Sequence, residues 1–186
     1  MSVKPNQEDK AQLFGLLKSN AFFREKIILS SGKESDYYFD ARRVTLSAQG
    51  AYYSAKVILD LIHDDQVDHI GGPTLGADPL LGALGVLSFQ MKKPLATFII
   101  RKSPKMHGKQ QQIEGPVIPP RARVILIDDV ATTGKAFIES LDVLGRMGIK
   151  PLKAVCLIDR QEGAREALAQ LGCPLISVFT AKDFLT

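Results

Sequence analysis

The sequence predicts an α/β fold in which a mostly parallel central sheet is flanked by helices. Two observations carry this prediction. From residue 64 onward, short apolar runs alternate with longer segments whose apolar residues recur at helical spacing. The chain has 186 residues, of which 45% are hydrophobic, and this is enough for one domain with a sizeable core. We therefore expect a single domain over residues 1–186, to which residues 1–45 contribute an arm.

The N-terminal part is expected to form a helix, an extended arm and a second helix. Leucines at helical spacing predict a first helix that ends near Asn20. Residues 27–45 have β-type composition, and Gly32 marks a hairpin turn within them. Ser47 can cap a second helix that continues to about His63. The apolar side of this helix would consist of Tyr52, Ala55, Val57, Ile58, Leu61 and Ile62.

Strands and helices then follow one another along the rest of the chain. We expect strands at residues 70–73, 96–100, 124–127, 151–158 and 175–179, and helices at residues 77–89 and 163–171. A further helix, marked by Leu141, Val143, Leu144 and Met147, follows the strand at 124–127. Residues 102–120 form a long polar connection. Such alternation is typical of parallel strands in one sheet with helices on both faces.

The most informative segment joins the strand at residues 124–127 to the next helix. Asp128 and Asp129 follow the strand, and residues 131–134 read Ala-Thr-Thr-Gly. The backbone N–H groups of such a turn can surround a phosphate at a helix N-terminus, where the peptide dipoles favour an anion. Two carboxylates at the carboxyl end of a strand suit the hydroxyl groups of a ribose. The pattern predicts a sugar-phosphate site; the alternative is an acidic pair that only caps the helix.

The long connection begins with a cationic segment. Four cations and a histidine lie within nine residues: Arg101, Lys102, Lys105, His107 and Lys109. Long connections inside compact domains are usually functional lids or unstructured pieces. This composition suits a cationic lid over a diphosphate, and the alternative is a solvated charge run in a surface loop.

Composition excludes several other classes of protein. The net charge is +4, but the cations outside residues 101–109 are dispersed and no aromatic residues interleave with that group, so we expect no nucleic-acid partner. The sequence has neither an 18-residue apolar run nor a signal-peptide pattern, so we expect no membrane association and a cytoplasmic location. Cys156 and Cys173 match no metal-ligand or redox spacing and are expected to be packing residues.

Three separated segments carry a family resemblance. They are Ser31-Gly32-Lys33-Glu34-Ser35 with the following Tyr-Tyr-Phe-Asp at residues 37–40, then Arg-Lys-Ser-Pro-Lys-Met-His-Gly at residues 101–108, then the acidic pair with its Thr-Thr-Gly turn. Together they resemble orotate phosphoribosyltransferases, enzymes of pyrimidine biosynthesis that join orotate to 5-phosphoribosyl-1-diphosphate (PRPP). The resemblance covers nearly the whole chain and implies a type I phosphoribosyltransferase fold, with residues 1–45 as a hood over the base. The acidic pair alone is shared with transferases for other bases and with non-catalytic PRPP-sensing regulators, which remain alternatives.

The resemblance implies a role for each matched residue. PRPP would be bound by Arg101, Lys102, Lys105, His107, Asp128, Asp129, Val130, Ala131, Thr132, Thr133, Gly134 and Lys135. Orotate would be bound by Lys33, Tyr38, Phe39, Thr132 and Arg160. The catalytic residues would be Lys105, His107, Asp128 and Asp129. His107 would act either in proton transfer or as a hydrogen-bond donor only.

The resemblance also implies Mg²⁺ as cofactor and a homodimer. Mg²⁺ would arrive with PRPP, because it prefers phosphates, hydroxyls and water to a cage of protein ligands. The lid would deliver Lys105 and His107 across the dimer interface into the partner's site. Two positions depart from the commonest family pattern, since Ser30 and Gly76 stand where lysines are expected. Lys33 would substitute for the first lysine, and backbone N–H groups of residues 72–76 for the second.

Overall fold

The computed structural model describes residues 5–28, 34–103 and 112–185. In this part of the chain, six strands form a central sheet with the order β10-β9-β8-β5-β6-β7. Neighbouring strands are parallel except β6 and β7, which are antiparallel. The strands are β5 (His69–Pro73), β6 (Ala96–Ile100), β7 (Ile113–Glu114), β8 (Val124–Ala131), β9 (Lys153–Asp159) and β10 (Leu175–Thr180). The predicted α/β class with a mostly parallel sheet is confirmed.

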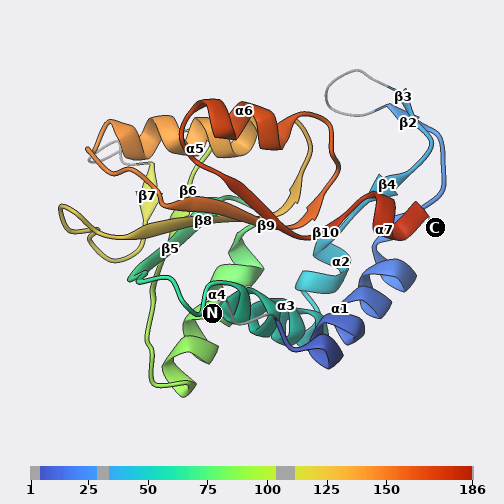
Figure 1. The fold of residues 1–186 in the computed structure, drawn as a ribbon, viewed down its shortest axis with the longest axis horizontal. Helices are drawn as coiled ribbons and strands as arrows, with labels where there is room; N and C mark the ends of the chain where they lie inside the picture. Colours follow the sequence, from blue (N-terminus) through green and yellow to red (C-terminus); the bar gives the residue numbers. More distant parts are fainter. Residues whose placement is uncertain (1–4, 29–33, 104–111, 186) are drawn as a thin grey trace.

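Helices cover both faces of this sheet, as Figure 1 shows. On one face lie α1 (Gln7–Asn20), α3 (Ala48–Leu61) and α4 (Asp78–Gln90), and on the other α5 (Lys135–Gly145) and α6 (Ala164–Gln170). Side chains of the central strands alternate between the two layers. In β9, Val155 and Leu157 belong to the core under α1, α3 and α4, whereas Ala154 and Cys156 belong to the core under α5 and α6. Both faces of the strand are therefore buried, as in other parallel sheets.

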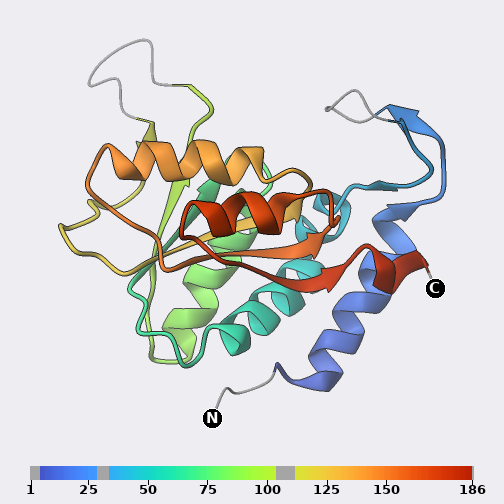
Figure 2. The same ribbon diagram turned by 45° about the horizontal axis from the view of Figure 1, so that its top comes forward.

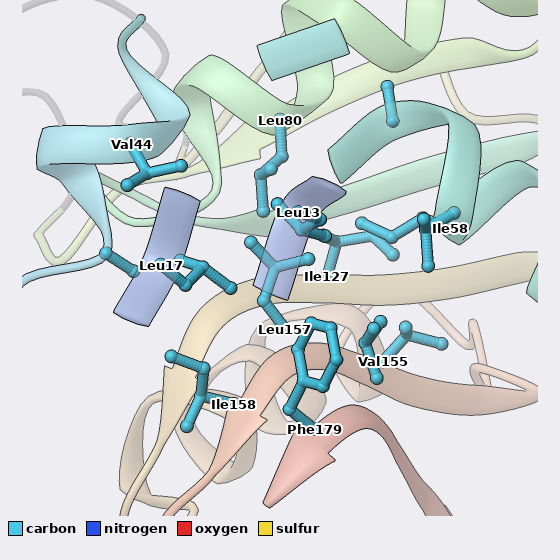
Figure 3. Close-up of a cluster of buried hydrophobic side chains, with 14 of the residues drawn as sticks. Leu13, Leu17, Val44, Ile58, Leu80, Ile127, Val155, Leu157, Ile158 and Phe179 are labelled. Atoms are coloured by element: carbon cyan, nitrogen blue, oxygen red, sulfur yellow. The ribbon is translucent and has the colours of Figure 1, made fainter. Parts of the chain in front are cut away.

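The core beneath α1 and α3 fixes the first helices against the sheet. Figure 3 shows Leu13 and Leu17 of α1 close to Ile127 of β8 and Leu157 of β9, and all four side chains are fully buried. Burying a leucine or isoleucine side chain contributes about 1.5–3 kcal/mol, so this contact holds the helix firmly to the sheet.

The prediction for α3 is confirmed at its start and wrong at one residue of its apolar side. The Gly50 N–H donates a hydrogen bond of 3.1 Å to Ser47 Oγ, which makes Ser47 the expected cap. Tyr52 is 44% exposed, because Ala55 and Ile58 belong to the side of α3 that packs in the core.

The arm contains two short antiparallel pairs that project from the body of the fold (Figure 2). β1 (Phe22–Phe23) pairs with β4 (Tyr38–Phe39), and β2 (Ile27–Ile28) pairs with β3 (Glu34–Ser35). The turn predicted at Gly32 lies outside the described residues. The ring centroid of Phe39 lies 5.1 Å from that of Phe22 and 5.0 Å from that of Phe184 in α7 (Lys182–Leu185). These aromatic contacts attach the base of the arm to the C-terminal helix.

Three elements differ from the sequence prediction, each because of a partner distant in sequence. Residues predicted as extended up to Thr45 instead end in a short helix, α2 (Arg42–Thr45), whose Val44 is buried in the core. The long connection contains β7, which pairs with β6. The strand predicted at 124–127 continues through the acidic pair to Ala131, because β9 pairs with it along this length. In the described part of the chain, no helix is long and apolar enough to cross a membrane.

Candidate active site

A cavity of about 700 Å³ opens where β5, β6 and β8 end. Parallel strands end at the same edge of a sheet, and ligands of open α/β sheets bind outside this edge. The strands and the loops after them contribute Pro73, Thr74, Leu75, Gly76, Ile100, Arg101, Lys102, Asp128, Asp129 and Val130. The arm and α2 contribute Phe39, Asp40, Ala41 and Arg42, and α5 forms much of the remaining wall. The structure therefore gathers the acidic pair, two predicted cations and one residue of the predicted base site around one space.

Asp128 and Asp129 lie in the last part of β8, and the backbone orients both. The Asp129 N–H donates to Asp128 Oδ1 at 2.9 Å, and the Val130 N–H donates to Asp129 Oδ1 at 2.7 Å. Asp128 is only 8% exposed. Burial and the neighbouring Asp129 charge raise the pKa of Asp128 well above its usual range, and burial also raises the pKa of Asp129. Perturbed pKa values of carboxyl groups in a cavity are typical of functional sites, so the pair is a candidate for binding a ligand's hydroxyls.

The loop after β5 packs directly against the acidic pair. A Cβ atom at Gly76 would lie 2.3 Å from Asp128 Oδ1 and 2.5 Å from Asp129 Oδ1. Thr74 Oγ1 donates a hydrogen bond of 2.7 Å to Asp78 Oδ2 in the first turn of α4, and its backbone N–H donates to Ile100 O at 3.0 Å. Glycine is therefore required at position 76 for the loop and the carboxylates to lie this close together.

The predicted phosphate turn lies between β8 and α5. Gly134 has φ +83, which favours glycine, and a Cβ atom there would lie 3.2 Å from Ala164 Cα. The predicted residues Ala131, Thr132, Thr133, Gly134 and Lys135 do not line the cavity of about 700 Å³, although Val130 and Ala136 on either side of them do. Lys135 is largely exposed and lies 3.8 Å from Glu139 Oε1. The turn and the N-terminus of α5 thus lie beside the cavity, and their phosphate role stays a prediction.

The cationic connection is held at its base by β6. The Arg101 N–H donates to Gln112 O at 2.8 Å, and Gln112 Nε2 donates to Arg101 O at 3.3 Å. The Arg101 guanidinium also contacts Glu114 Oε1 at 3.4 Å. Arg101 and Lys102 line the cavity. Lys105 and His107 lie outside the described residues, and so does Lys33 of the arm.

The predicted orotate residues are divided between the cavity and the arm. Phe39 lines the cavity, whereas Tyr38 stacks on Phe23 with 6.5 Å between ring centroids. Arg160 is buried and does not line the cavity, because its guanidinium is engaged elsewhere. Its Nε donates to Glu162 Oε1 at 2.8 Å, its Nη2 donates to Ser35 Oγ at 3.1 Å, and it lies 4.7 Å from the Tyr37 ring centroid. Arg160 thus connects the end of β9 to the arm, and its contact with orotate stays a prediction.

Sequence reasoning missed several polar residues of the cavity wall. Asp40, Arg42 and Arg146 are among them, since none of the three was assigned a site role from the sequence. Asp40 and Arg42 carried a usable signal, since both closely follow the aromatic residues of the arm. Arg146 carried none, because it reaches the cavity from the far end of α5.

Comparison with known proteins decides the family. A family model described as the phosphoribosyl transferase domain matches residues 48–174, which is well over half of the chain. Among curated relatives, an orotate phosphoribosyltransferase of Rhodopseudomonas palustris (strain BisB5) is 36% identical over 95% of this chain and 96% of the relative. The chain belongs to the orotate phosphoribosyltransferase family. A second relative of that name, from Synechocystis sp., is 36% identical over 98% of this chain and 92% of its own length.

Solved structures of this family agree with the fold. The Mycobacterium tuberculosis H37Rv orotate phosphoribosyltransferase in complex with Fe(III) dicitrate has a TM-score of 0.83 and 32% identity, covering 95% of this chain and 98% of that one. The same enzyme in complex with PRPP has a TM-score of 0.79 and 29% identity, covering 96% and 99%. The predicted phosphoribosyltransferase fold is confirmed, and the similarity extends beyond the family domain into the N-terminal arm.

Proposed function

We propose that this chain transfers the phosphoribosyl group of PRPP to orotate, giving orotidine 5′-monophosphate and diphosphate in pyrimidine biosynthesis. The observation that carries the proposal is the similarity to orotate phosphoribosyltransferases over 95% of the chain, which includes the arm as well as the phosphoribosyl transferase domain. The arm matters because it supplies Phe39 to the cavity beside the acidic pair.

The geometry supports a division of the cavity between the parts of PRPP. Asp128 and Asp129 would accept hydrogen bonds from the ribose hydroxyls, and the turn before α5 would bind the 5′-phosphate at the helix N-terminus. Arg101 and Lys102 would stabilise the diphosphate. Breaking the bond from C1′ to diphosphate places positive charge on the ribose and negative charge on the leaving group, so cations fixed around the diphosphate favour the transition state. Orotate then attacks C1′ without a covalent enzyme intermediate.

Mg²⁺ is part of the proposal as a partner of PRPP. In the described part of the chain, no three His, Cys, Asp or Glu side chains lie close enough together to hold a metal ion. The donor set at the cavity, two neighbouring carboxylates, suits an ion that keeps most of its ligands from phosphate, hydroxyl and water. When bound, Mg²⁺ would neutralise charge on the diphosphate. Omitting Mg²⁺ should abolish turnover, and restoring it should recover the rate.

A homodimer with a shared lid completes the proposal. A groove between α3 and α4 is lined by apolar residues, among them Leu46, Tyr52 and Val86, which are exposed in the single chain. Exposed apolar patches often mark protein interfaces, and a second copy of the chain is the occupant that we propose. Lys105 and His107 would act in the partner's site. Light scattering tests the dimer, and activity regained on mixing Lys105→Ala with Asp128→Asn chains tests the shared site.

A cytoplasmic location is also proposed. Its support is that Cys156 and Cys173 are free thiols, both buried, and that burial raises the pKa of each, that of Cys173 to about 11. Both are packing residues, as predicted, and thiols of this kind are ordinary in a reducing compartment. Cell fractionation tests the location.

Turnover with a panel of bases tests the proposed reaction. The purified protein is mixed with PRPP, Mg²⁺ and either orotate or one of uracil, adenine, guanine and hypoxanthine, and the absorbance of each base is followed. We expect consumption of orotate alone. Consumption of another base in preference would assign the chain to a different transferase, and no turnover with any base, together with PRPP binding, would favour a PRPP-sensing regulator.

A further inference from the structure

The cavity wall contains a cation whose role the family resemblance did not assign. Arg42, the first residue of α2, lines the cavity together with Asp129 and the loop at residues 74–76. Its side chain is 43% exposed, and its Nε donates a hydrogen bond of 3.0 Å to Asp40 Oδ1. The guanidinium makes no other hydrogen bond to the described residues. The N–H groups of both Nη atoms are therefore available to a ligand.

The loop at residues 74–76 carries no positive charge of its own, since it reads Thr-Leu-Gly. At Gly76 a Cβ atom would lie within 2.5 Å of a carboxylate oxygen on both Asp128 and Asp129, so a side chain there would have to displace the acidic pair. Leu75 is apolar and exposed, and it lines the cavity. Arg42 and Leu75 also line together a second, adjoining hollow with Asp40 and Asp78. The positive charge that this loop lacks is therefore available beside it, on Arg42.

The other arginines of the described cavity wall are placed differently. Arg101 contacts Glu114 at 3.4 Å, at the end of β6. Arg146 directly follows α5, and its guanidinium already has two partners: it contacts Asp142 Oδ2 at 3.1 Å and donates to Gln112 Oε1 at 2.9 Å. Arg42 approaches from α2 instead, and its charge reaches the acidic pair. Burial raises the pKa of Asp129, and Arg42 acts against this rise.

We propose that Arg42 is a substrate-binding residue that donates hydrogen bonds from its Nη atoms to the diphosphate group of PRPP, in place of the lysine absent from residues 74–76. The forked N–H groups of a guanidinium match two phosphate oxygens better than a single ammonium does. Asp40 fixes the orientation of the fork through Nε. The diphosphate would then be bound between Arg42 on one side and Arg101 with Lys102 on the other. This assignment rests on the proposed function, because it takes PRPP as the ligand.

Calorimetric titration with inorganic diphosphate and Mg²⁺ tests the assignment directly. The variants are Arg42→Gln, Arg42→Lys and the neighbouring control Arg43→Gln, whose side chain is exposed and lies 4.9 Å from the Phe23 ring centroid. Charge-assisted hydrogen bonds to phosphate are strong, so Arg42→Gln should weaken diphosphate binding about tenfold to a hundredfold. Arg42→Lys should lose less, because it keeps the charge, and Arg43→Gln should bind within about twofold of the unchanged protein.

Steady-state kinetics separates the diphosphate from the base. Arg42→Gln should raise the KM for PRPP by a similar factor while the KM for orotate changes less than about twofold. Unchanged diphosphate binding in Arg42→Gln, or a larger effect on orotate than on PRPP, would overturn the assignment. If circular dichroism shows that Arg42→Gln does not fold, Arg42→Lys replaces it. Diphosphate binding that is weakened severalfold in Arg42→Lys would then support the assignment, and unchanged binding would overturn it.

The titration contains no base, so the two proposals fail separately. Diphosphate binding that depends on Arg42 in a protein that does not consume orotate would contradict the proposed reaction and support the Arg42 assignment. Orotate turnover in a protein whose diphosphate binding does not depend on Arg42 would support the proposed reaction and contradict the Arg42 assignment.

Discussion

Replacing Asp128 by asparagine should stabilise the ligand-free protein while it removes activity. Burial raises the pKa of Asp128, with the Asp129 charge as the second cause, so the folded state disfavours the ionised form. Below the ordinary pKa of an aspartate this loss of stability is absent. It grows as the pH rises from the ordinary pKa of the unfolded state through the raised pKa of the folded state. Asparagine carries no charge and its Oδ1 can still accept the 2.9 Å hydrogen bond from the Asp129 N–H.

The size of the effect follows from the site. The substitution keeps the volume and the backbone hydrogen bond, and removes a buried charge beside a second carboxylate. A single stabilising substitution typically raises the free energy of unfolding by about 0.5–2 kcal/mol. In a domain of this size, about 1 kcal/mol corresponds to a rise of about 2–4 °C in Tm. We expect this rise at pH 7 and a much smaller one near pH 4, because the loss of stability only begins to grow at the ordinary pKa of an aspartate.

Thermal unfolding between pH 4 and pH 8, without ligands, measures the difference. Asp142→Asn is the matched control, because Asp142 is an exposed carboxylate paired with Arg146 at 3.1 Å, and its loss should change stability by less than about 0.5 kcal/mol. A Tm for Asp128→Asn that falls at pH 7, or a difference from the unchanged protein that does not vary with pH, would show that the buried Asp128 charge does not destabilise the folded state.

Three further predictions concern the loop beside the acidic pair, the end of β9 and the proposed dimer surface. Gly76→Ala should lower kcat/KM for PRPP about tenfold or more with little loss of secondary structure, because its Cβ would displace both carboxylates. Kinetics and circular dichroism check this, and Gly15→Ala in α1, with nothing within 4 Å of its Cβ, is the control. Arg160→Ala should raise the KM for orotate much more than that for PRPP, and equal effects on both would remove Arg160 from the base site. Val86→Asp, at an exposed apolar residue of the groove between α3 and α4, should weaken the proposed dimer in light scattering. An unchanged mass would move the interface away from this groove.

Local signals were enough to predict most of the fold. The strand at residues 96–100 was predicted at its observed bounds, and Ser47 was predicted as a cap, because an apolar run and a capping side chain act on their nearest neighbours. β7 and the continuation of β8 to Ala131 could not be predicted, since each depends on a ladder with a strand distant in the sequence. α2 is too short to show a period.

The candidate site was predictable where the functional residues follow a strand directly. Asp128, Asp129, Arg101 and Lys102 were named from their positions at strand ends, and the structure brings all four to one cavity. Arg42 had a sequence signal in its position after the arm, but its place in the cavity wall depends on tertiary packing and was missed. The close approach of Gly76 to the acidic pair is likewise a tertiary feature, and the sequence alone showed Gly76 only as a departure from the family pattern.

Mass spectrometry of the products shows whether this chain makes a nucleotide from orotate and PRPP at its acidic pair. The unchanged protein and the Asp128→Asn/Asp129→Asn variant are each incubated with orotate, PRPP and Mg²⁺. We predict orotidine 5′-monophosphate and diphosphate in equal amounts from the unchanged protein and none from the variant, whose fold is checked by circular dichroism. Absence of the nucleotide from both samples would contradict the proposed reaction. Its formation by the folded variant at an unchanged rate would contradict the role of the acidic pair.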